Sequence, residues 1–339
     1  MVRLRPLSTA LIATTTAASL ALAASSAGAQ EYPTRDITNV VVWSAGGGTD
    51  VANRVVSEHM AQALGVNINV TNRPGGVAGS LGMSYGYQQP ANGYTIVGLS
   101  ESCVTAAVQG GWDQRFEVWY PFIIGGSPDV ISVNPDSGFE TLADLVEAAG
   151  SGDINAAAGG AGSIHHLNLL ALEKGTGADF NFIPYPGSAP AQTAAMTGEV
   201  TIVVTSLAEQ QQLIRGGRLK PLGMLTPDSF DLADHGTIPS AFDAYPDLAE
   251  YLPISQAIGM AVRADAPDEV KAKLTEAFDA ALATPEVQKW AEENYYILSG
   301  QTGAEASETF ADLESLFSWT LWELDAAEVN PEELGIPKP

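Results

Sequence analysis

Glycine and hydroxyl residues gather in this sequence at points where a buried-strand pattern gives way to a helical one. The sharpest case follows the apolar run Asn39–Trp43 and consists of Ala45, Gly46, Gly47, Gly48, Thr49 and Asp50. Glycine lets the backbone approach a ligand closely, and the following helix presents unpaired N–H groups at its positive end. These residues predict a binding loop for an anion, with a turn needed only for packing as the alternative. Thr49 or Asp50 is expected to cap the helix.

Two later segments repeat this arrangement. Ala158–Leu167 and Tyr185–Ala191 each turn at glycine and open a helix at a serine, and the strand Val200–Thr205 ends in a hydroxyl. In open α/β sheets such junctions lie at the carboxyl ends of strands, where ligands bind. The residues predicted to contact a ligand from these junctions are Ser163 and Ser188, both also expected as helix caps, with His166, Ala189 and Thr205.

Sequence patterns of enzymes and metal sites are missing from this chain. The glycine loop lacks a following Gly-Lys-Ser/Thr and the G-x-G-x-x-G form of nucleotide loops. No G-x-S-x-G elbow occurs. His165 and His166 are adjacent, so they face different sides of a helix and cannot form a metal pair one turn apart. We predict that the protein is not an enzyme and has no cofactor and no metal, and we interpret its histidines as hydrogen-bonded surface or interdomain residues.

The elements that must position these loops alternate between strand and helix. The length fits two domains, and the strand–helix–strand alternation predicts a parallel sheet with helices on its faces. Residues 228–253 are irregular and aromatic. Strands are expected at 39–43, 67–70, 94–99, 122–133 (in two pieces), 154–158, 180–185, 200–205 and 258–262. Helices are expected from 49 and at 79–88, 142–149, 163–173, 189–196, 207–214, 267–282 and 304–329.

Charge and cysteine content narrow the class of protein. Lys and Arg number 15 against 40 Asp and Glu, a net charge of −25. Such an acidic chain is a poor partner for nucleic acid or an anionic bilayer. Cys103 is the single cysteine, so no intramolecular disulfide can form.

The first 29 residues have the pattern of a signal peptide. Arg3 and Arg5 precede a mostly apolar stretch from Leu7 to Ala24, and Ala27-Gly28-Ala29 supplies the small residues of a cleavage site. We therefore expect export out of the cytoplasm and a mature chain beginning near Gln30 or Glu31. No later stretch has the 18 or so apolar residues of a membrane-spanning helix, so membrane insertion is not expected.

Several short motifs, in order along the chain, resemble those of one family. They are Ala45–Asp50 with Arg54, Asn72–Gly76, Asn92–Thr95, Gly162-Ser163 with His166-Leu167, Pro184–Ala191, Gly217–Leu222 and Ala264–Pro267. The chain resembles the substrate-binding receptors of the tripartite tricarboxylate transporters, the TctC-like or Bug periplasmic proteins. The resemblance spans nearly the whole chain after the signal peptide.

The resemblance implies a periplasmic-binding-protein fold of the second type, with two α/β lobes joined by two crossover strands and closing over a ligand by hinge bending. Lobe 1 would hold residues 30–127 plus 258–339, and lobe 2 residues 128–257. The implied function is capture of a small organic carboxylate by the 45–50 loop and the opposing Ser163, Ser188 and Thr205, followed by delivery to membrane transporter subunits. We expect a monomer. A ligand-sensing module for a signalling partner, and an exported α/β hydrolase or lyase using Ser163 and His166, remain alternatives.

Two places depart from the family pattern. Trp43 stands where the family more often has Phe, and the segment Ser100–Gln114, with Glu101, Cys103 and Trp112, is atypical. We assign Trp43 and Ser100 to the ligand site, and the rest of the segment is a candidate for the far end of the cleft. An acidic Glu101 there would favour a ligand with a hydrogen-bond donor or a cation, although a surface position is the expectation for this residue.

Overall fold

The computed structural model describes residues 32–150, 153–252 and 256–339. The predicted signal peptide, residues 1–29, lies outside the described residues. Within them Arg35–Pro339 forms one compact unit, and the fold described below is the fold of that unit.

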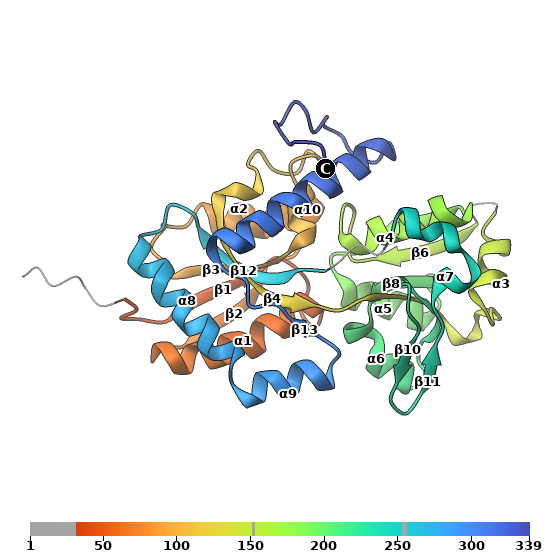
Figure 1. Ribbon diagram of the computed structural model, residues 1–339, viewed down its shortest axis with the longest axis horizontal. Coiled ribbons are helices and arrows are strands. Elements are labelled where there is room, and N and C mark those ends of the chain that lie inside the picture. Colours follow the sequence, from red (N-terminus) through yellow and green to blue (C-terminus); the bar gives the residue numbers. More distant parts are fainter. Residues whose placement is uncertain (1–31, 151–152, 253–255) are drawn as a thin grey trace, which may run out of the picture. The chain divides into compact units, whose positions relative to one another are not determined.

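The first of two large sheets in the described residues is mixed and has the order β13-β4-β12-β3-β1-β2 (Figure 1). β1 pairs in parallel with β2 and β3, whereas β12 runs antiparallel to β3 and β4. Its strands are β1 (Ile37–Val41), β2 (Ile68–Asn72), β3 (Thr95–Ser100), β4 (Trp119–Gly126), β12 (Ile258–Arg263) and β13 (Ile297–Leu298).

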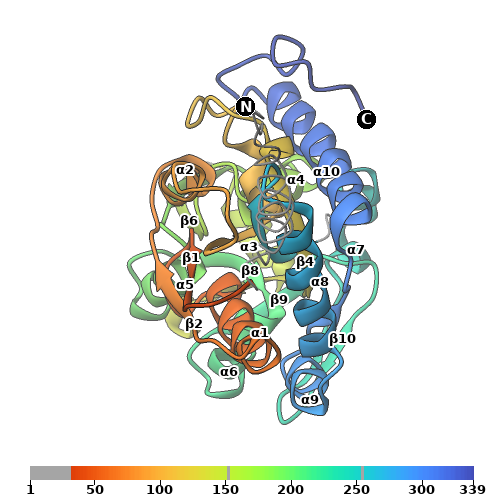
Figure 2. The ribbon, with the colours of Figure 1, turned by 90° about the vertical axis from the view of Figure 1, so that its left-hand side faces the viewer.

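Helices cover both faces of this sheet. α1 and α8 pack against each other on one face, and α2 and α10 lie on the other (Figures 1 and 2). α1 buries Val56, Met60 and Leu64 at helical spacing and ends at Gly65, whose left-handed φ of 71° a residue with a side chain rarely adopts. The helices of this half are α1 (Gly48–Leu64), α2 (Ser80–Tyr87), α8 (Asp268–Leu282), α9 (Pro285–Glu293) and α10 (Gly303–Glu323), with short 3₁₀ turns η1 (Val77–Gly79), η2 (Glu101–Thr105) and η3 (Phe116–Val118).

The second large sheet has the order β7-β6-β8-β5-β9. β6 is parallel to β7 and β8, and β5 is antiparallel to β8 and β9. Its strands are β5 (Asp129–Val133), β6 (Ile154–Ala158), β7 (Phe180–Pro184), β8 (Ile202–Ser206) and β9 (Lys220–Met224), and a hairpin of β10 (Phe230–Leu232) and β11 (Gly236–Ile238) lies beside it.

Two separate cores fill the faces of this second sheet. Side chains of α3, α4 and α7 form one core, and those of α5 and α6 form the other. The helices are α3 (Leu142–Ala148), α4 (Ile164–Thr176), α5 (Ser188–Thr197), α6 (Leu207–Arg215) and α7 (Ala241–Ala244), with 3₁₀ turns η4 (Pro135–Ser137) and η5 (Pro246–Glu250). The architecture is thus two α/β lobes, as predicted. The predicted parallel sheet is wrong, because both large sheets are mixed: β12 and β5, which do not follow a crossover helix, run antiparallel to their neighbours.

The chain passes from the first sheet to the second between β4 and β5 and returns before β12 (Figure 1). At these crossings the Ser127 N–H donates to Gln256 Oε1 at 3.0 Å, which ties the outgoing and returning segments together. Strands of the first sheet fall within 37–126 and 258–298, and those of the second within 129–224. The predicted boundaries at 127/128 and 257/258 agree with this arrangement and stay a proposal.

Two predictions about elements need correction, and three elements were not predicted. The last long helix ends at Glu323 instead of residue 329, because Asp325 takes a left-handed φ of 55° that reverses the chain. Residues 228–253 are not wholly irregular, since they contain β10, β11, α7 and η5. β9, α9 and β13 were not predicted at all, because they are short and two of them lie at sheet edges.

A search of the described residues finds no helix with the length and apolar character needed to cross a membrane.

Replacing Phe310 by alanine tests the core that α10 shares with the first sheet. Phe310 is fully buried, and its ring stacks on Phe116 with centroids 4.2 Å apart. The cavity left by Phe310→Ala should lower the free energy of unfolding by about 3–5 kcal/mol. Equilibrium urea denaturation measures this loss. Glu308→Ala, an exposed change on the same helix, should keep the free energy of unfolding within about 0.5 kcal/mol of the parent. If both variants lose the same free energy, Phe310 does not belong to the core as described.

Candidate functional site

A small cavity lies where the two lobes meet. Its volume is about 20 Å³, which is room for about one or two water molecules. The first lobe lines it with the β1–α1 loop and the residues after β3, and the second lobe with the helix starts that follow β6, β7 and β8. The lining residues are Trp43, Gly47, Gly48, Thr49, Ser100, Glu101, Ser102, Gly159, Ser163, His165, Gly187, Ser188, Glu209 and Gln256.

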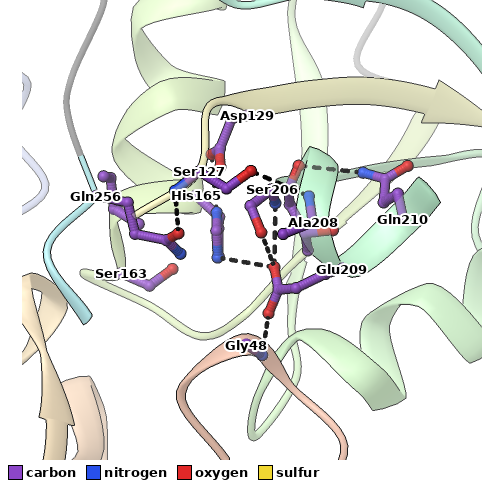
Figure 3. A network of polar contacts seen from close by, with 12 residues as sticks. Gly48, Ser127, Asp129, Ser163, His165, Ser206, Ala208, Glu209, Gln210 and Gln256 are labelled. Atoms are coloured by element: carbon purple, nitrogen blue, oxygen red, sulfur yellow. Dashed lines mark hydrogen bonds and ion pairs between the residues drawn. The ribbon is translucent and has the colours of Figure 1, made fainter. Parts of the chain in front are cut away.

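The N-terminus of α1 reaches this cavity through three glycines. Gly46 has a φ of 84°, and Gly47 is the extended residue that precedes the helix. A Cβ at Gly48 would lie 3.0 Å from Glu209 Oε1, so a side chain there would crowd the opposite lobe. Gly48 donates its N–H to that oxygen at 2.6 Å (Figure 3). The helix N-terminus therefore already holds a carboxylate, as its orphan N–H groups and dipole favour.

The predicted cap at Thr49 or Asp50 is wrong, because Gly47 occupies the cap position without a side-chain bond. The Asp50 carboxylate folds back instead and accepts the Gly46 N–H at 2.9 Å. Burial opposes ionisation of this group, but hydrogen bonds from Arg54, Gly46 and Asn72 outweigh it and hold the pKa of Asp50 below its ordinary value. Asp50 therefore shapes the loop from behind the cavity wall.

Glu209 stands on α6 and bridges the lobes. Its second oxygen, Oε2, accepts the backbone N–H of Ser206 at 3.0 Å and the Ser206 hydroxyl at 2.8 Å, in the manner of a capping box. The same oxygen lies 3.6 Å from His165 Nε2 (Figure 3). One oxygen is thus fixed in its own lobe and the other reaches across to Gly48.

His165 supplies a buried positive charge beside Glu209. Its Nδ1 lies 2.8 Å from Asp129 Oδ2, which also accepts the Asn168 amide at 2.7 Å. Burial disfavours the imidazolium, but the carboxylates of Asp129, Glu209 and Glu101 outweigh that cost and raise the pKa of His165 to about 9. At neutral pH the ring is therefore protonated, with Nδ1 donating to Asp129 and Nε2 facing the Glu209 carboxylate at ion-pair distance.

Glu101 is buried at the cavity wall with 1% of its surface exposed, so the expected surface position is wrong. Its Oε1 accepts the Ser102 hydroxyl at 2.7 Å, and its Oε2 accepts the Ala257 N–H at 2.6 Å in the returning crossover. Burial raises the pKa of this carboxyl despite both bonds. Cys103 and Trp112 do not line the cavity; Cys103 is buried in the core, and Trp112 packs on Trp119.

Further contacts hold the lobes together around the cavity. The N–H and hydroxyl of Ser44 both donate to Pro186 O, at 3.2 and 2.8 Å. The Ile164 N–H donates to Ser102 Oγ at 2.9 Å, and the Thr105 hydroxyl donates to Gly162 O at 2.8 Å. The described conformation is therefore closed.

The structure brings about half of the predicted ligand residues to the cavity wall. These are Trp43, Gly47, Gly48, Thr49, Ser100, Ser163 and Ser188. Ser163 caps α4 as predicted, accepting the His166 N–H at 3.2 Å, whereas Ser188 is the first residue of α5 after the cap Gly187. Contact between these residues and a ligand stays a prediction.

The other predicted residues lie away from the wall, and they are Ala45, Gly46, Asp50, His166, Ala189 and Thr205. His166 stacks on Phe182 with ring centroids 3.9 Å apart, and burial lowers its pKa to about 4. Thr205 is fully buried and accepts the Gln192 amide. Both side chains are held by their own lobe.

Sequence reasoning did not assign six cavity residues to the ligand site, namely Ser102, Gly159, His165, Gly187, Glu209 and Gln256. The Ser206-x-x-Glu209 spacing was a visible capping-box signal that places Glu209 at a helix start. His165 was interpreted as a surface or interdomain residue, and the structure places it between the lobes. In the described part of the chain, no group of three or more His, Cys, Asp or Glu is arranged to hold a metal ion.

Comparison with known proteins gives a consistent result. The sequence model described as "Tripartite tricarboxylate transporter family receptor" matches residues 52–302. Protein BugT of Bordetella pertussis is 32% identical over 232 residues, which cover 66% of this chain and 67% of BugT. A protein encoded in the tcbD–tcbE intergenic region of Pseudomonas sp. strain P51 is 28% identical over 87% of both chains.

Solved structures resemble this one in fold. The periplasmic binding protein BugD matches with a TM-score of 0.78 and 22% identity over 87% of this chain and 99% of BugD. Two Rhodopseudomonas palustris proteins, MatC with bound malate and Rpa4515 with adipate, match with TM-scores of 0.74 and 0.77 at 20% and 21% identity. They cover 87% and 88% of this chain and 99% of their own. The predicted periplasmic-binding-protein fold is confirmed.

The charged state of His165 should appear in the pH dependence of stability. A pKa raised from 6.5 to about 9 stabilises the folded protein fully below about 6.5, and this contribution is lost as pH rises to about 9. The melting temperature should therefore fall across this window in the parent and stay flatter in His165→Gln. His59→Gln, a half-buried histidine on α1, should keep the parental slope. If melting temperature falls with pH by the same slope in all three proteins, the assignment of a buried, charged His165 is wrong.

Proposed function

Because the chain belongs to the receptor family of the tripartite tricarboxylate transporters, we propose that it captures a small organic carboxylate between its lobes. It is exported by residues 1–29, works outside the cytoplasm as a monomer, and delivers the ligand to the membrane subunits of such a transporter. Solved proteins of the same fold that carry malate and adipate support a carboxylate ligand.

One observation carries this proposal: the Gly48 N–H at the start of α1 holds a carboxylate that comes from the opposite lobe. Glu209 Oε1 accepts that N–H at 2.6 Å with the lobes closed. The geometry needed to grip an anion between lobes is therefore present and occupied by a side chain of the protein. A ligand carboxylate takes the place of Glu209 Oε1 and gains the same N–H donor and the nearby His165 cation.

Ligand entry requires the lobes to separate, because the cavity of about 20 Å³ is far smaller than a dicarboxylate. The two crossings near Ser127 and Gln256 are the hinge, and bending there opens the cleft. Ser163, Ser188, Trp43 and Ser100 then contact the ligand from both sides as the lobes close.

Catalysis finds no support in the geometry of Ser163 and His166. The Ser163 hydroxyl accepts the backbone N–H of His166, while the imidazole Nδ1 faces the Gly162 N–H at 3.2 Å and the ring stacks on Phe182. The His166 ring is therefore held in place by its own loop, through Gly162, and by the core residue Phe182. Binding without chemistry remains the function that this arrangement favours.

A panel of mono-, di- and tricarboxylates tests the proposal in the mature protein. At least one acid should raise the melting temperature by several degrees at millimolar concentration, since a ligand that binds only the folded state stabilises it by mass action. Differential scanning fluorimetry measures the shift, with sodium chloride at matched ionic strength as the control. If no organic acid moves the midpoint beyond that control, the proposed function is wrong.

Gly48→Ala tests the role of the α1 N-terminus. A Cβ would lie 3.0 Å from the present position of Glu209 Oε1 and 3.1 Å from the Tyr296 hydroxyl, so it would displace a bound carboxylate. Affinity for any acid found in the panel should fall about tenfold, equivalent to about 1.4 kcal/mol. Isothermal titration calorimetry measures this. Gly150→Ala is the matched control, because a Cβ there meets only Glu147 O at 3.9 Å; a Gly48 variant that binds like this control would exclude the N-terminus as anchor.

A further inference from the structure

Negative charge outweighs positive charge around the cavity. The ionisable residues that line it are Glu101, Glu209 and His165, and no Lys or Arg is among the lining residues that the structure describes. The His165 cation is already flanked by Asp129 at 2.8 Å on one side and by Glu209 at 3.6 Å on the other. The three carboxyl groups of Glu101, Glu209 and Asp129 therefore share the single His165 cation, which leaves negative charge in excess around the cavity.

This excess of negative charge around the cavity lowers the affinity for a ligand that carries only negative charge. Glu101 and Glu209 come from different lobes and their side chains are both almost wholly buried, and among the described residues that line the cavity His165 is the one cation beside them. Like charges repel strongly where water is scarce, and an unpaired buried charge is costly. Once one ligand carboxylate takes the N–H of Gly48, a second anionic group would have to lie beside these glutamates.

Both glutamates keep capacity to accept a hydrogen bond. An ionised carboxyl has about four acceptor positions. Each oxygen of Glu101 accepts one bond, from Ser102 and from Ala257. When a ligand takes the Gly48 N–H, Glu209 stays anchored to Ser206 through Oε2, and its Oε1 is released to face the ligand.

An aromatic ring lines the same space. Trp43 is 8% exposed, and its indole N–H donates to Ser100 Oγ at 3.2 Å, which fixes the ring against the wall. The face of a tryptophan attracts a cationic nitrogen. The ring is independent of the glutamates, and it favours the same kind of ligand group.

We propose, resting on the function proposed above, that the ligand is a small carboxylate that also carries a cationic nitrogen, such as an amino acid. Its carboxylate binds the Gly48 N–H and His165, and its nitrogen is recognised by Glu101, Glu209 and the face of Trp43. The two glutamates are the residues that discriminate this ligand from a plain organic acid.

Matched ligand pairs that differ only in an amino group test the proposal. Succinate with aspartate, glutarate with glutamate, and butyrate with 4-aminobutyrate are titrated by isothermal calorimetry into the mature protein at neutral pH and fixed salt. The aminated member of at least one pair should bind ten times more tightly, or better, than its partner. Glu101→Gln and Glu209→Gln should each bring this ratio toward one, because glutamine keeps the shape and loses the charge. Glu308→Gln, exposed on α10, should leave the ratio unchanged.

The outcomes separate this inference from the function on which it rests. If plain acids bind as tightly as their aminated partners or more tightly, the inference is overturned and carboxylate capture stands. If no acid of either kind binds, the proposed function itself fails. If the preference for the aminated ligand persists in both glutamine variants, the assignment to Glu101 and Glu209 is overturned. If Glu101→Gln does not fold, the inference is still tested by the ratio of affinities within each ligand pair in the parent and in Glu209→Gln.

Discussion

The start of α1 needs a partner for its exposed N–H groups, and the rest of the site is built around that need. The first turn of any helix leaves such donors unpaired, and burying them without a partner is costly. Here the donor at Gly48 meets the Glu209 carboxylate from the other lobe at 2.6 Å. The glycines make this approach possible, because a Cβ at Gly48 would crowd that oxygen. The hydrogen bond between Gly48 and Glu209 thus does two things: it satisfies a backbone donor at the start of α1, and it joins the two closed lobes.

Glu209 can serve in this way because its own lobe holds it in place. Ser206 binds one of its oxygens through both the backbone N–H and the hydroxyl, and the His165 cation lies 3.6 Å from the same oxygen. His165 in turn keeps its charge because Asp129 pairs with its other nitrogen at 2.8 Å. Buried charges persist only when they are compensated in this manner. The network therefore presents a fixed anion to α1 without leaving a lone charge in the interior.

Features that depend on neighbouring residues were predictable from the sequence, and features that depend on lobe closure were not. The strand–glycine–helix junction at 45–50 and the Ser163 cap follow from local patterns. Glu209 lies 161 positions from Gly48, so nothing in its surroundings along the chain indicates their contact. His165 and His166 are one residue apart, and a rotation of about 100° on the helix decides which of them reaches the cavity. Thr205 lies away from the cavity wall for a similar reason, since alternate residues of a strand face opposite sides and its side chain points into the lobe.

Because a side-chain carboxylate already fills the proposed anion position of the closed form, the proposed ligand binding is an exchange of one carboxylate for another. Glu209 already places an anion at the α1 N-terminus and beside His165, so the free-energy cost of burying a carboxylate there is present without a ligand. A ligand carboxylate therefore gains little over Glu209 at that position, and it adds charge to a cavity that already contains Glu101. Differences in affinity between ligands must then arise from the rest of the molecule, where the wall offers acceptors, hydroxyls and an aromatic face. Under the proposed function, selectivity is set by the groups that accompany the ligand carboxylate more than by the carboxylate itself.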